Sequence, residues 1–406
     1  MKPDDQHWQD LAIEAGRVFT PTAPIDERSL FAGREEQVRS IVDVVNQKGQ
    51  HAILFGERGV GKTSLANVLS SFLGNPGGSV IAPRVNCDTL DTFDTVWRKI
   101  FEQIELTRTV PAPGFARGEV DAPYSSAELL GDSIAPDSVR RALTVLSNHA
   151  LPILIVDEFD RLSPDQRKPF ADTIKTLSDH AVRATVVLVG VADSVADLIQ
   201  EHASVERALV QIRMPRMSPV EINKIVTTGL SRLEMSIDPP ALKRIARLSQ
   251  GLPHYAHLLG LHASRAALDN RETGVTTEAI EKAIDRAIRG AQQSIKSAYE
   301  YAIRSPRKDN LFSEVLLACA LADSNELGLF AAQDVREPLR RITGKNYEIP
   351  SFAQHLNEFC EAKRGPVLQK SGTKRFFRYR FINPLMQPFV ILNGLKSGRI
   401  SSEALD

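Results

Sequence analysis

The sequence predicts an α/β protein with a doubly wound parallel sheet, followed by a helical lid subdomain and a C-terminal winged helix. Apolar strand patterns alternate with helical patterns from residue 31 to about residue 215, as repeated strand–helix–strand units require. The strand patterns are nearly continuous β-branched runs such as ILIV and TVVLV, which are typical of parallel strands covered on both faces. Beyond residue 218 the pattern becomes helical, and three short helices and an apparent hairpin follow. We therefore expect an N-terminal arm, a sheet domain, a lid and a winged helix at residues 1–30, 31–215, 216–292 and 296–398.

The composition is that of a globular protein without a strong global charge. Of the 406 residues, 42% are hydrophobic and 25% are charged, and the formal net charge is zero. Any attraction to nucleic acid or to an anionic membrane must therefore be local. No apolar run reaches the roughly 18 residues that cross a bilayer, and the polar N-terminus lacks a signal-peptide pattern. Cys87, Cys319 and Cys360 are scattered, which argues against disulfides or a zinc site and favours a cytoplasmic location.

In the sheet domain, five apolar runs are expected to be strands, and a helix should follow the first of them over residues 62–73. Residues 107–137 are rich in Pro, Gly, Ala and Ser, so we expect a mobile surface insertion there, without a catalytic role. The expected strands are 51–55, 80–85, 152–156, 185–189 and 210–212.

The lid is expected to be entirely helical. Ser218 precedes Pro219 and Glu221, which is the pattern of an N-cap with Pro in the first turn and an acid that completes a capping box. The expected lid helices are 219–233, 240–248, 253–268 and 277–289. The expected elements of the winged helix are helices 310–321, 331–342 and 350–362 and strands 367–370 and 376–382.

The segment between the first strand and its helix reads G-x-x-x-x-G-K-T, the pattern of a phosphate-binding loop. Its glycines let backbone N–H groups surround phosphates, and the helix N-terminus adds its dipole. Lys62 is expected to reach the β- and γ-phosphates of ATP, and Thr63 to place its hydroxyl on Mg²⁺. A glycine-rich strand-to-helix turn without a ligand is the alternative interpretation. The expected nucleotide-binding residues here are Gly56, Glu57, Arg58, Gly59, Val60, Gly61, Lys62, Thr63 and Ser64.

Two acidic residues follow the strand at 152–156 and supply the second half of a nucleotide-hydrolysing site. Asp157 is expected to bind Mg²⁺ through its water shell, and Glu158 is expected to orient and deprotonate the attacking water. Solvated strand ends are the alternative interpretation.

Three further polar residues are candidates at this site. Asp193 and Ser194 follow the next strand and could contact the γ-phosphate or the attacking water, although helix capping explains them equally well. Arg207 precedes the last strand and could act catalytically as an arginine finger in a neighbouring subunit. An ordinary surface arginine is an equally consistent interpretation.

Together these residues resemble AAA+-related ATPases of the STAND class and the origin-recognition initiator family, over about residues 30–290. The stretch Phe31-Ala32-Gly33-Arg34-Glu35 is similar to the family's GRE motif, which lies beside the adenine. The resemblance implies that Phe31, Gly33 and Arg34 help to bind the nucleotide.

Two shorter motifs extend this resemblance. Val85-Asn86-Cys87 is similar to the NC motif that follows the second strand of origin-recognition ATPases. Gly251-Leu252-Pro253 resembles the GxP motif of STAND lids, which implies that Pro253 packs on the base. Helix punctuation, with a glycine ending one helix and a proline opening the next, is the alternative.

The C-terminal hairpin is strongly basic, with seven basic residues and no acid from residue 363 to residue 380. On a two-residue period, Tyr379 and Phe381 share one face, while Arg378 and Arg380 share the other. Such a wing can lie along DNA phosphates. A simply soluble strand pair, or one that binds an acidic protein, is the alternative. The candidate partner-binding residues are Lys370, Lys374, Arg375, Arg378 and Arg380.

The third helix of the winged helix argues against reading of DNA sequence. It should expose Gln354 and Asn357, which can read adenine edges. It should also expose Glu358 and Glu361, which phosphates would repel. We therefore expect contact with the DNA backbone or with a protein.

We expect an ATP-dependent switch that hydrolyses ATP with Mg²⁺ and controls assembly with a partner through its winged helix. The resemblance implies a homo-oligomer that acts on DNA or on an effector protein, in bacterial defence or a mobile element. The alternative function is a DNA-binding AAA+ loader or recruiter that oligomerises on duplex DNA. A third possibility is a nucleotide-binding scaffold that never hydrolyses ATP.

Overall fold

The computed structural model describes residues 5–21, 33–74, 79–111, 119–192, 195, 198–199, 203–306, 310–373 and 376–401. Contacts divide the chain into two units. The sheet unit joins residues 25–56 and 62–214, and the helical unit joins residues 1–24, 57–61 and 215–406. The tip of the phosphate-binding loop therefore belongs, by its contacts, to the helical unit. Among the described residues, no helix has the length and apolarity needed to span a membrane.

A parallel sheet forms the centre of the sheet unit, in the strand order β2-β6-β7-β1-β8, with β3 also paired to β6. Each described pair in this sheet is parallel. All five expected strands are present, but the strand expected at 80–85 is split around Pro83, which has no N–H to donate to a ladder. The strands are β1 (His51–Gly56), β2 (Val80–Ile81), β3 (Arg84–Asn86), β6 (Leu151–Asp157), β7 (Thr185–Val191) and β8 (Leu209–Arg213).

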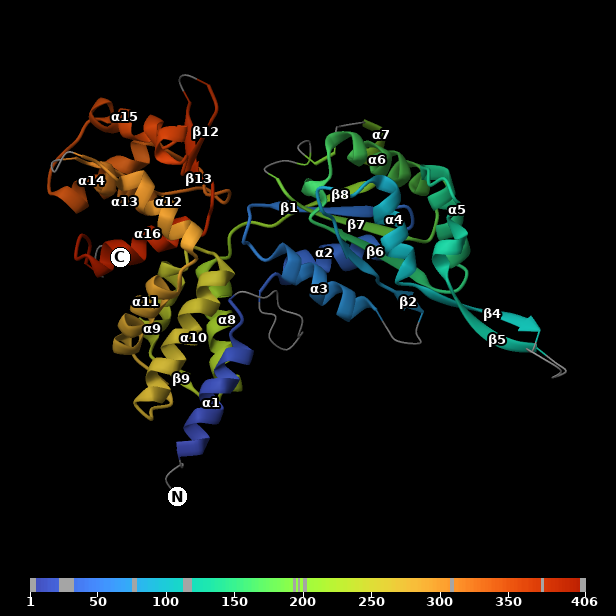
Figure 1. The fold of residues 1–406 in the computed structure, drawn as a ribbon, viewed down its shortest axis with the longest axis horizontal. Coiled ribbons are helices and arrows are strands. Elements are labelled where there is room, and N and C mark those ends of the chain that lie inside the picture. The colour runs from blue at the N-terminus through green and yellow to red at the C-terminus, as the bar shows by residue number, and fades with distance from the viewer. Residues whose placement is uncertain are drawn as a thin grey trace. The chain divides into compact units, whose positions relative to one another are not determined.

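Helices cover both faces of this sheet, which confirms the doubly wound α/β fold (Figure 1). Ile53, Leu154 and Val186 face one hydrophobic core, while the alternate residues Ala52 and Val187 are equally buried and face the other way. Five long helices pack in this unit: α2 (Glu35–Val45), α3 (Lys62–Leu73), α4 (Phe93–Glu102), α5 (Pro136–Leu146) and α6 (Pro164–Asp179).

Aromatic rings fill the core between the sheet and helices α4 and α6. Trp97 is fully buried and stacks on Phe170 with ring centroids 5.7 Å apart. Phe93 and Phe159 meet Phe170 edge-on at 5.0 and 5.2 Å. Such pairs add about 0.5–1.5 kcal/mol each beyond their buried area, so this cluster fixes the helices that flank the end of β6.

The surface insertion expected at 107–137 contains a hairpin that the sequence did not predict. β4 (Glu105–Pro111) pairs antiparallel with β5 (Glu119–Ser125), and the hairpin projects from its unit (Figure 1). The 3₁₀ turn η2 (Ser126–Leu129) and helix α5 follow. Pro, Gly, Ala and Ser are frequent in this stretch, whereas the start of β5 alternates polar and apolar residues over 119–122, a pattern that favours a strand.

The four expected lid helices are present in the helical unit, within one or two residues of their expected ends. The expected capping box forms, because the Ser218 hydroxyl accepts from the Glu221 N–H and the Glu221 carboxylate accepts from the Ser218 N–H. The short strands β9 (Ser236–Ile237) and β10 (Gly274–Val275) pair in parallel between these helices. The helices are α8 (Pro219–Arg232), α9 (Pro239–Leu248), α10 (Pro253–Asp269) and α11 (Thr277–Gly290).

The N-terminal segment differs from the expected arm. Residues 5–18 form helix α1 (Asp5–Val18), which packs on α10. Phe19, only 1% exposed, lies where Gly229 and Gly260 offer no side chain: a Cβ on either would fall 2.5 or 2.7 Å from its ring. Residues 5–19 therefore pack against helices α8 and α10 of the helical unit.

The C-terminal residues combine helices with a three-stranded sheet in the order β11-β13-β12. The expected hairpin is present, because β12 (Leu368–Ser371) and β13 (Arg378–Phe381) pair antiparallel. The helix expected at 331–342 instead begins at Arg336, after strand β11 (Phe330–Ala331) and a 3₁₀ turn at 332–335. The helices are α12 (Gln293–Ile303), α13 (Phe312–Leu321), α14 (Arg336–Thr343), α15 (Ile349–Glu358) and α16 (Met386–Lys396), and the sequence analysis missed α12 and α16.

Candidate nucleotide-binding site

The phosphate-binding loop connects β1 to α3, as the motif predicts. Gly59 and Gly61 have φ values of +86° and +94°, a conformation that side chains disfavour. Lys62 opens α3 with its side chain buried, and its Nζ donates a hydrogen bond of 3.0 Å to the Gly56 carbonyl. The lysine therefore lies folded over its own loop. A bound phosphate would offer it a charged and stronger acceptor.

Gly56 ends β1 in a place where only glycine fits. A Cβ there would lie 2.4 Å from the Met214 carbonyl oxygen, just beyond the end of β8. The Met214 N–H donates to the Phe55 carbonyl at 2.8 Å, which continues the pairing of β8 with β1. The loop thus leaves the sheet from a backbone position fixed on one side by β8.

Asp157 lies at the carboxyl end of β6, and β7 separates β6 from β1. Because the strands are parallel, the phosphate-binding loop and Asp157 leave the same edge of the sheet. The Asp157 side chain is 3% exposed. Its Oδ2 accepts from Nη2 of Arg84 at 2.8 Å, and its Oδ1 accepts from the Glu158 N–H at 2.8 Å. Arg84 was not identified from the sequence; it lies on β3, beside β6.

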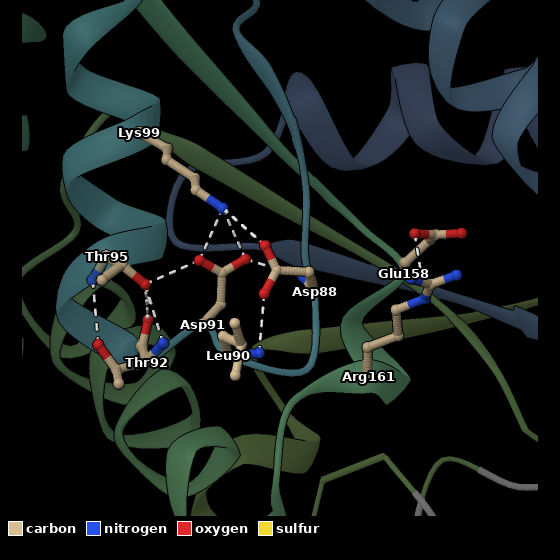
Figure 2. Close-up of polar contacts among 8 residues, drawn as sticks. All are labelled: Asp88, Leu90, Asp91, Thr92, Thr95, Lys99, Glu158 and Arg161. Carbon is tan, nitrogen blue, oxygen red and sulfur yellow. Dashed lines mark hydrogen bonds and ion pairs between the residues drawn. The ribbon is translucent and has the colours of Figure 1, made fainter.

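Glu158 adopts a left-handed backbone conformation with φ of +54°, which turns the chain sharply after β6. Its carboxylate lies 3.2 Å from Nε of Arg161, and its side chain is 39% exposed (Figure 2). The carboxylate is therefore open to water, as a group that activates water must be. An exposed ion pair of this kind is weak and can open readily.

The turn after the Asn86-Cys87 motif is held by a cluster of charges (Figure 2). Lys99 on α4 reaches Asp91 at 2.6 Å and Asp88 at 3.4 Å. Burial acts to raise the pKa of Asp91, but hydrogen bonds from Lys99, the Asp88 backbone and Thr95 outweigh it and lower that pKa. The hydrogen bond to Asp91 raises the pKa of Lys99. Both groups are thus charged at neutral pH, and they anchor the start of α4.

Cys87 contributes no reactive thiol to this region. Its side chain is buried, and burial raises the pKa of the thiol to about 12. Its N–H donates to the Asp157 carbonyl at 2.8 Å, which extends the pairing of β3 with β6. The motif therefore supports the backbone beside Asp157.

Asp160 is a further residue that the sequence analysis missed. Its Oδ1 accepts from the Val191 N–H at 2.7 Å, at the end of β7. A Cβ on Gly190 would lie 3.3 Å from the same oxygen and 2.9 Å from Leu198. The bond ties the segment after Asp157 to the end of β7, and the spacing D-E-F-D could have pointed to it.

Of the remaining nucleotide-binding candidates, the structure describes Gly33 and Arg34. Gly33 and Arg34 have φ values of +79° and +62° and precede α2, and Arg34 is 2% exposed. Phe31, Asp193 and Ser194 lie outside the described residues. The roles of all five in nucleotide binding remain predictions.

In the helical unit, the Gly251-Leu252-Pro253 motif packs beside the tip of the phosphate-binding loop. A Cβ on Gly61 would lie 3.7 Å from Cγ of Pro253, and one on Gly59 would lie 4.0 Å from a methyl group of Leu252. Gly251 has φ of +72°, and its carbonyl accepts from the Met217 N–H at 2.9 Å. Pro253 opens α10, so the motif also punctuates the helices.

Arg207 is exposed and lies two residues before β8, at the amino ends of the parallel strands. Gly56 and Asp157 lie at the carboxyl ends of theirs. Arg207 is therefore at the opposite edge of the sheet from the phosphate-binding loop, and action in a neighbouring subunit stays a prediction.

Cations on the C-terminal hairpin have neighbours from other elements. Nζ of Lys370 donates to Oδ1 of Asn357 at 2.8 Å and lies 3.7 Å from the centre of the Phe377 ring. Arg378 lies 3.8 Å from Asp334, and Arg380 donates to Gln369 at 2.8 Å. Lys374 and Arg375 lie outside the described residues.

The expected acidic repulsion on α15 is smaller than the sequence suggests. The Glu358 side chain is 13% exposed and lies 3.5 Å from Arg364 and 3.6 Å from Lys363. Tyr379 and Phe381 are buried while Arg378 is exposed, in the alternation expected for β13.

Comparison with known proteins gives the same fold. A family model for the AAA domain matches residues 45–199. A search of curated proteins gave no match. Among solved structures, a Walker-type ATPase of Pyrococcus abyssi is 16% identical with a TM-score of 0.51, covering 92% of this chain and 99% of that one.

Two archaeal structures give lower TM-scores. The ORC2 protein of Aeropyrum pernix, solved as ADPNP-ADP complexes, is 15% identical with a TM-score of 0.48, covering 94% of this chain and 98% of that one. The ORC1 protein of the same organism, solved with DNA, is 17% identical with a TM-score of 0.44, covering 93% and 95%. Residues 45–199 therefore match the AAA domain model, and the parallel sheet that these residues help to form agrees with that match.

Proposed function

We propose that this protein binds ATP with Mg²⁺ at the phosphate-binding loop and hydrolyses it with Glu158. The observation that carries the proposal is the pairing, at one edge of a parallel sheet, of a loop closed by Lys62 with the acids that follow β6. Backbone N–H groups of the loop would bind the phosphates, and Lys62 would leave the Gly56 carbonyl to contact the β- and γ-phosphates.

The residues fit a magnesium ion. The Thr63 hydroxyl and the Asp157 carboxylate are the oxygen donors that Mg²⁺ prefers, and Mg²⁺ needs only one or two carboxylates beside substrate phosphates. The Arg84 guanidinium lies 2.8 Å from Asp157, and the ion is proposed to take its place beside this buried carboxylate. When bound, the ion would neutralise charge on the β- and γ-oxygens.

Glu158 is proposed to act on the attacking water. Its carboxylate would leave Arg161, accept a hydrogen bond from the water and take its proton as the water attacks the γ-phosphorus. The bond from that phosphorus to the oxygen that bridges the β- and γ-phosphates would break, which releases ADP and phosphate. Asp160 would keep the end of β7 in place, because it bonds the Val191 N–H. Asp193 and Ser194, which follow β7, are proposed to contact the γ-phosphate or that water.

A pair of substitutions separates binding from catalysis. Lys62→Ala removes a charged hydrogen-bond donor, so ATP affinity should fall by about 10- to 100-fold. Glu158→Gln keeps the shape but not the base, so ATP should bind nearly as in wild type while phosphate release falls by about 10²–10⁴-fold. Fluorescent-nucleotide titration and phosphate release measure the two effects.

Glu272→Gln, at an exposed position of the helical unit, is the matched control and should change neither quantity. Equal phosphate release by wild type and Glu158→Gln would reject the catalytic role. Undetectable turnover in wild type with tight ATP binding would instead favour the nucleotide-binding scaffold.

The proposed output is a switch in which bound nucleotide controls assembly with a partner through residues 296–398. Helices α13, α14 and α15 followed by the hairpin of β12 and β13, with β11 completing a small sheet, support a winged helix within these residues. The resemblance to STAND ATPases favours an effector protein as the partner, in bacterial defence or a mobile element.

DNA is the second candidate partner, and the observation that favours it is the exposed side chain of Arg378 on a strand with a buried opposite face. The carboxylate near it, Asp334, lies 3.8 Å away, and such surface pairs are weak enough for phosphates to replace. Four cations on phosphates would give a slope of about −3.6 for log K against log salt.

Anisotropy of a labelled duplex across a salt series, with ATP, tests this candidate. Binding should weaken in Lys374→Glu/Arg378→Glu but not in Lys282→Glu/Arg289→Glu, which changes the same charge on α11. Duplex sequence should matter little, because phosphate contacts carry no base information. No binding at low salt would leave the effector protein as the partner, and tight binding by the wing variant would place DNA on another surface.

A further inference from the structure

The phosphate-binding loop carries an acidic side chain, Glu57, that is buried. Its carboxylate accepts two hydrogen bonds from one guanidinium: Nε of Arg216 lies 2.7 Å from Oε2, and Nη2 lies 2.9 Å from Oε1. The Glu57 and Arg216 side chains are only 4% and 10% exposed. A carboxylate this deep needs such a partner, because an isolated buried charge is strongly unfavourable.

Two glutamines hold Arg216 in turn. Its Nη1 donates to Oε1 of Gln387 at 2.6 Å and lies 3.4 Å from the Gln250 carbonyl. Nε2 of Gln387 donates to Oε1 of Gln250 at 3.2 Å and to the Ala320 carbonyl, on α13, at 2.9 Å. Gln387 belongs to α16 and is 2% exposed. A chain of hydrogen bonds therefore runs from the phosphate-binding loop into the C-terminal helices.

Two glycines leave room for the guanidinium. A Cβ on Gly328 would lie 2.6 Å from Nη2 of Arg216 and 3.1 Å from Oε1 of Glu57. A Cβ on Gly251 would lie 2.8 Å from Cβ of Arg216. The ion pair is surrounded by four segments: the phosphate-binding loop, the residues just before α8, the residues just before α10 and the C-terminal residues. None of these segments can shift without disturbing the pair.

The charge of this pair bears directly on phosphate binding. The backbone N–H groups expected to receive phosphates belong to the same loop as Glu57. The negative charge of the Glu57 carboxylate would by itself repel the phosphates, and Arg216 neutralises that charge. The bidentate contact also fixes the direction of the carboxylate and hence of the loop backbone that carries it.

We propose that Arg216 is a positioning residue for the phosphate-binding loop, and that through Gln387 the C-terminal helix α16 sets its position. The inference rests on the proposed binding of ATP. Nucleotide affinity and the packing of α16 are then coupled, and such coupling is reciprocal. A partner that binds or displaces α16 changes the affinity of the protein for nucleotide, and bound nucleotide changes its affinity for that partner.

Affinity measurements on the full chain test the first half of this coupling. Arg216→Gln removes the neutralising charge and Gln387→Leu removes only its support, so both should weaken binding of a fluorescent ATP analogue. We expect losses of about 20-fold and about fivefold, within the usual range of coupling between sites. Glu57→Gln combined with Arg216→Gln restores neutrality and should recover part of the loss.

Gln333→Leu is the matched control, since Gln333 is exposed elsewhere in the C-terminal residues. It should bind like wild type. Unchanged or tighter binding in Arg216→Gln and Gln387→Leu would overturn the inference. Circular dichroism without nucleotide checks each fold, and Gln387→Leu alone decides the outcome if Arg216→Gln does not fold.

Hydrogen exchange tests the reverse direction. Nucleotide should slow exchange of the amides of α16 at least threefold in wild type and not in Gln387→Leu, a change that a purely structural role for Gln387 would not produce. Equal slowing in both proteins would contradict the coupling. If wild type binds no ATP, the proposed function fails and the inference with it, whereas tight wild-type binding with unchanged variants overturns the inference alone.

Discussion

At the residue scale, the least expected feature is the ion pair of Asp157 with Arg84. The two residues are 73 positions apart, and they meet because β3 lies beside β6 in the sheet. The Arg84 side chain is 19% exposed and also donates to Asn86 at 2.8 Å. The arginine thus competes with any cation that approaches Asp157.

Arg84→Gln removes this competing charge. Without nucleotide, the free energy of unfolding should fall by about 1–3 kcal/mol, because the buried carboxylate loses its charged partner. The Mg²⁺ concentration for half-maximal nucleotide binding should also fall, by about three- to tenfold, because the ion no longer displaces a guanidinium. Urea unfolding and Mg²⁺ titrations of nucleotide binding measure these two effects.

Arg98→Gln changes the same charge at an exposed position of α4 and serves as the control. A higher Mg²⁺ requirement in Arg84→Gln would show that Arg84 assists the metal site instead of competing with it.

At the element scale, helix α1 is the clearest departure from expectation. Prolines at 21 and 24 and a polar composition suggested an arm, yet Trp8, Leu11 and Ala15 already have helical spacing. Phe19 secures the helix, because its ring packs against Gly229 on α8 and Gly260 on α10. A sequence pattern shows that a helix can form but not that glycines about two hundred residues away make room for the side chain that follows it.

Phe19→Ala should release α1 from the lid. Removing a buried phenylalanine typically costs about 3–5 kcal/mol, so the thermal midpoint should fall and α1 should become open to proteases. Ile13→Ala, on the same helix but 58% exposed, is the control and should do neither. Differential scanning fluorimetry and limited proteolysis give the comparison, and an unchanged cleavage pattern in Phe19→Ala would mean that other contacts hold the helix.

At the scale of the whole molecule, Arg207 lies at the sheet edge opposite to Gly56 and Asp157 in the same chain. If it contributes to hydrolysis, it must therefore reach a neighbouring copy. The rate per subunit should then rise with protein concentration, and Arg207→Ala should lower it by as much as about 10³-fold, as for arginine fingers.

Arg183→Ala is a matched control, because Arg183 is also exposed and also precedes a strand, β7, at the amino edge. Phosphate release across a dilution series measures both variants. A rate that does not depend on concentration, together with full activity of Arg207→Ala, would return Arg207 to an ordinary surface role.

The sequence by itself determined the local elements of this protein and the chemistry of its central motif. Strands β6 and β7 follow directly from β-branched runs, and strand β1 and helix α3 from the phosphate-loop pattern between them. The capping box at Ser218 and the glycines of the phosphate-binding loop could be predicted from the sequence equally well. These features depend on backbone preferences over a few residues, so a short window of sequence contains their cause.

Only the tertiary structure decided which distant side chains meet. Arg84 joins Asp157 because of strand order, and Asp334 reaches Arg378 because β11 pairs with β13. Arg216 meets both Glu57 and Gln387 because distant segments close on one loop. Hydrophobic periodicity specifies that an element is buried but not the element on which it packs. The charges that neutralise one another in these three pairs therefore come from positions that the sequence keeps apart and that packing brings together.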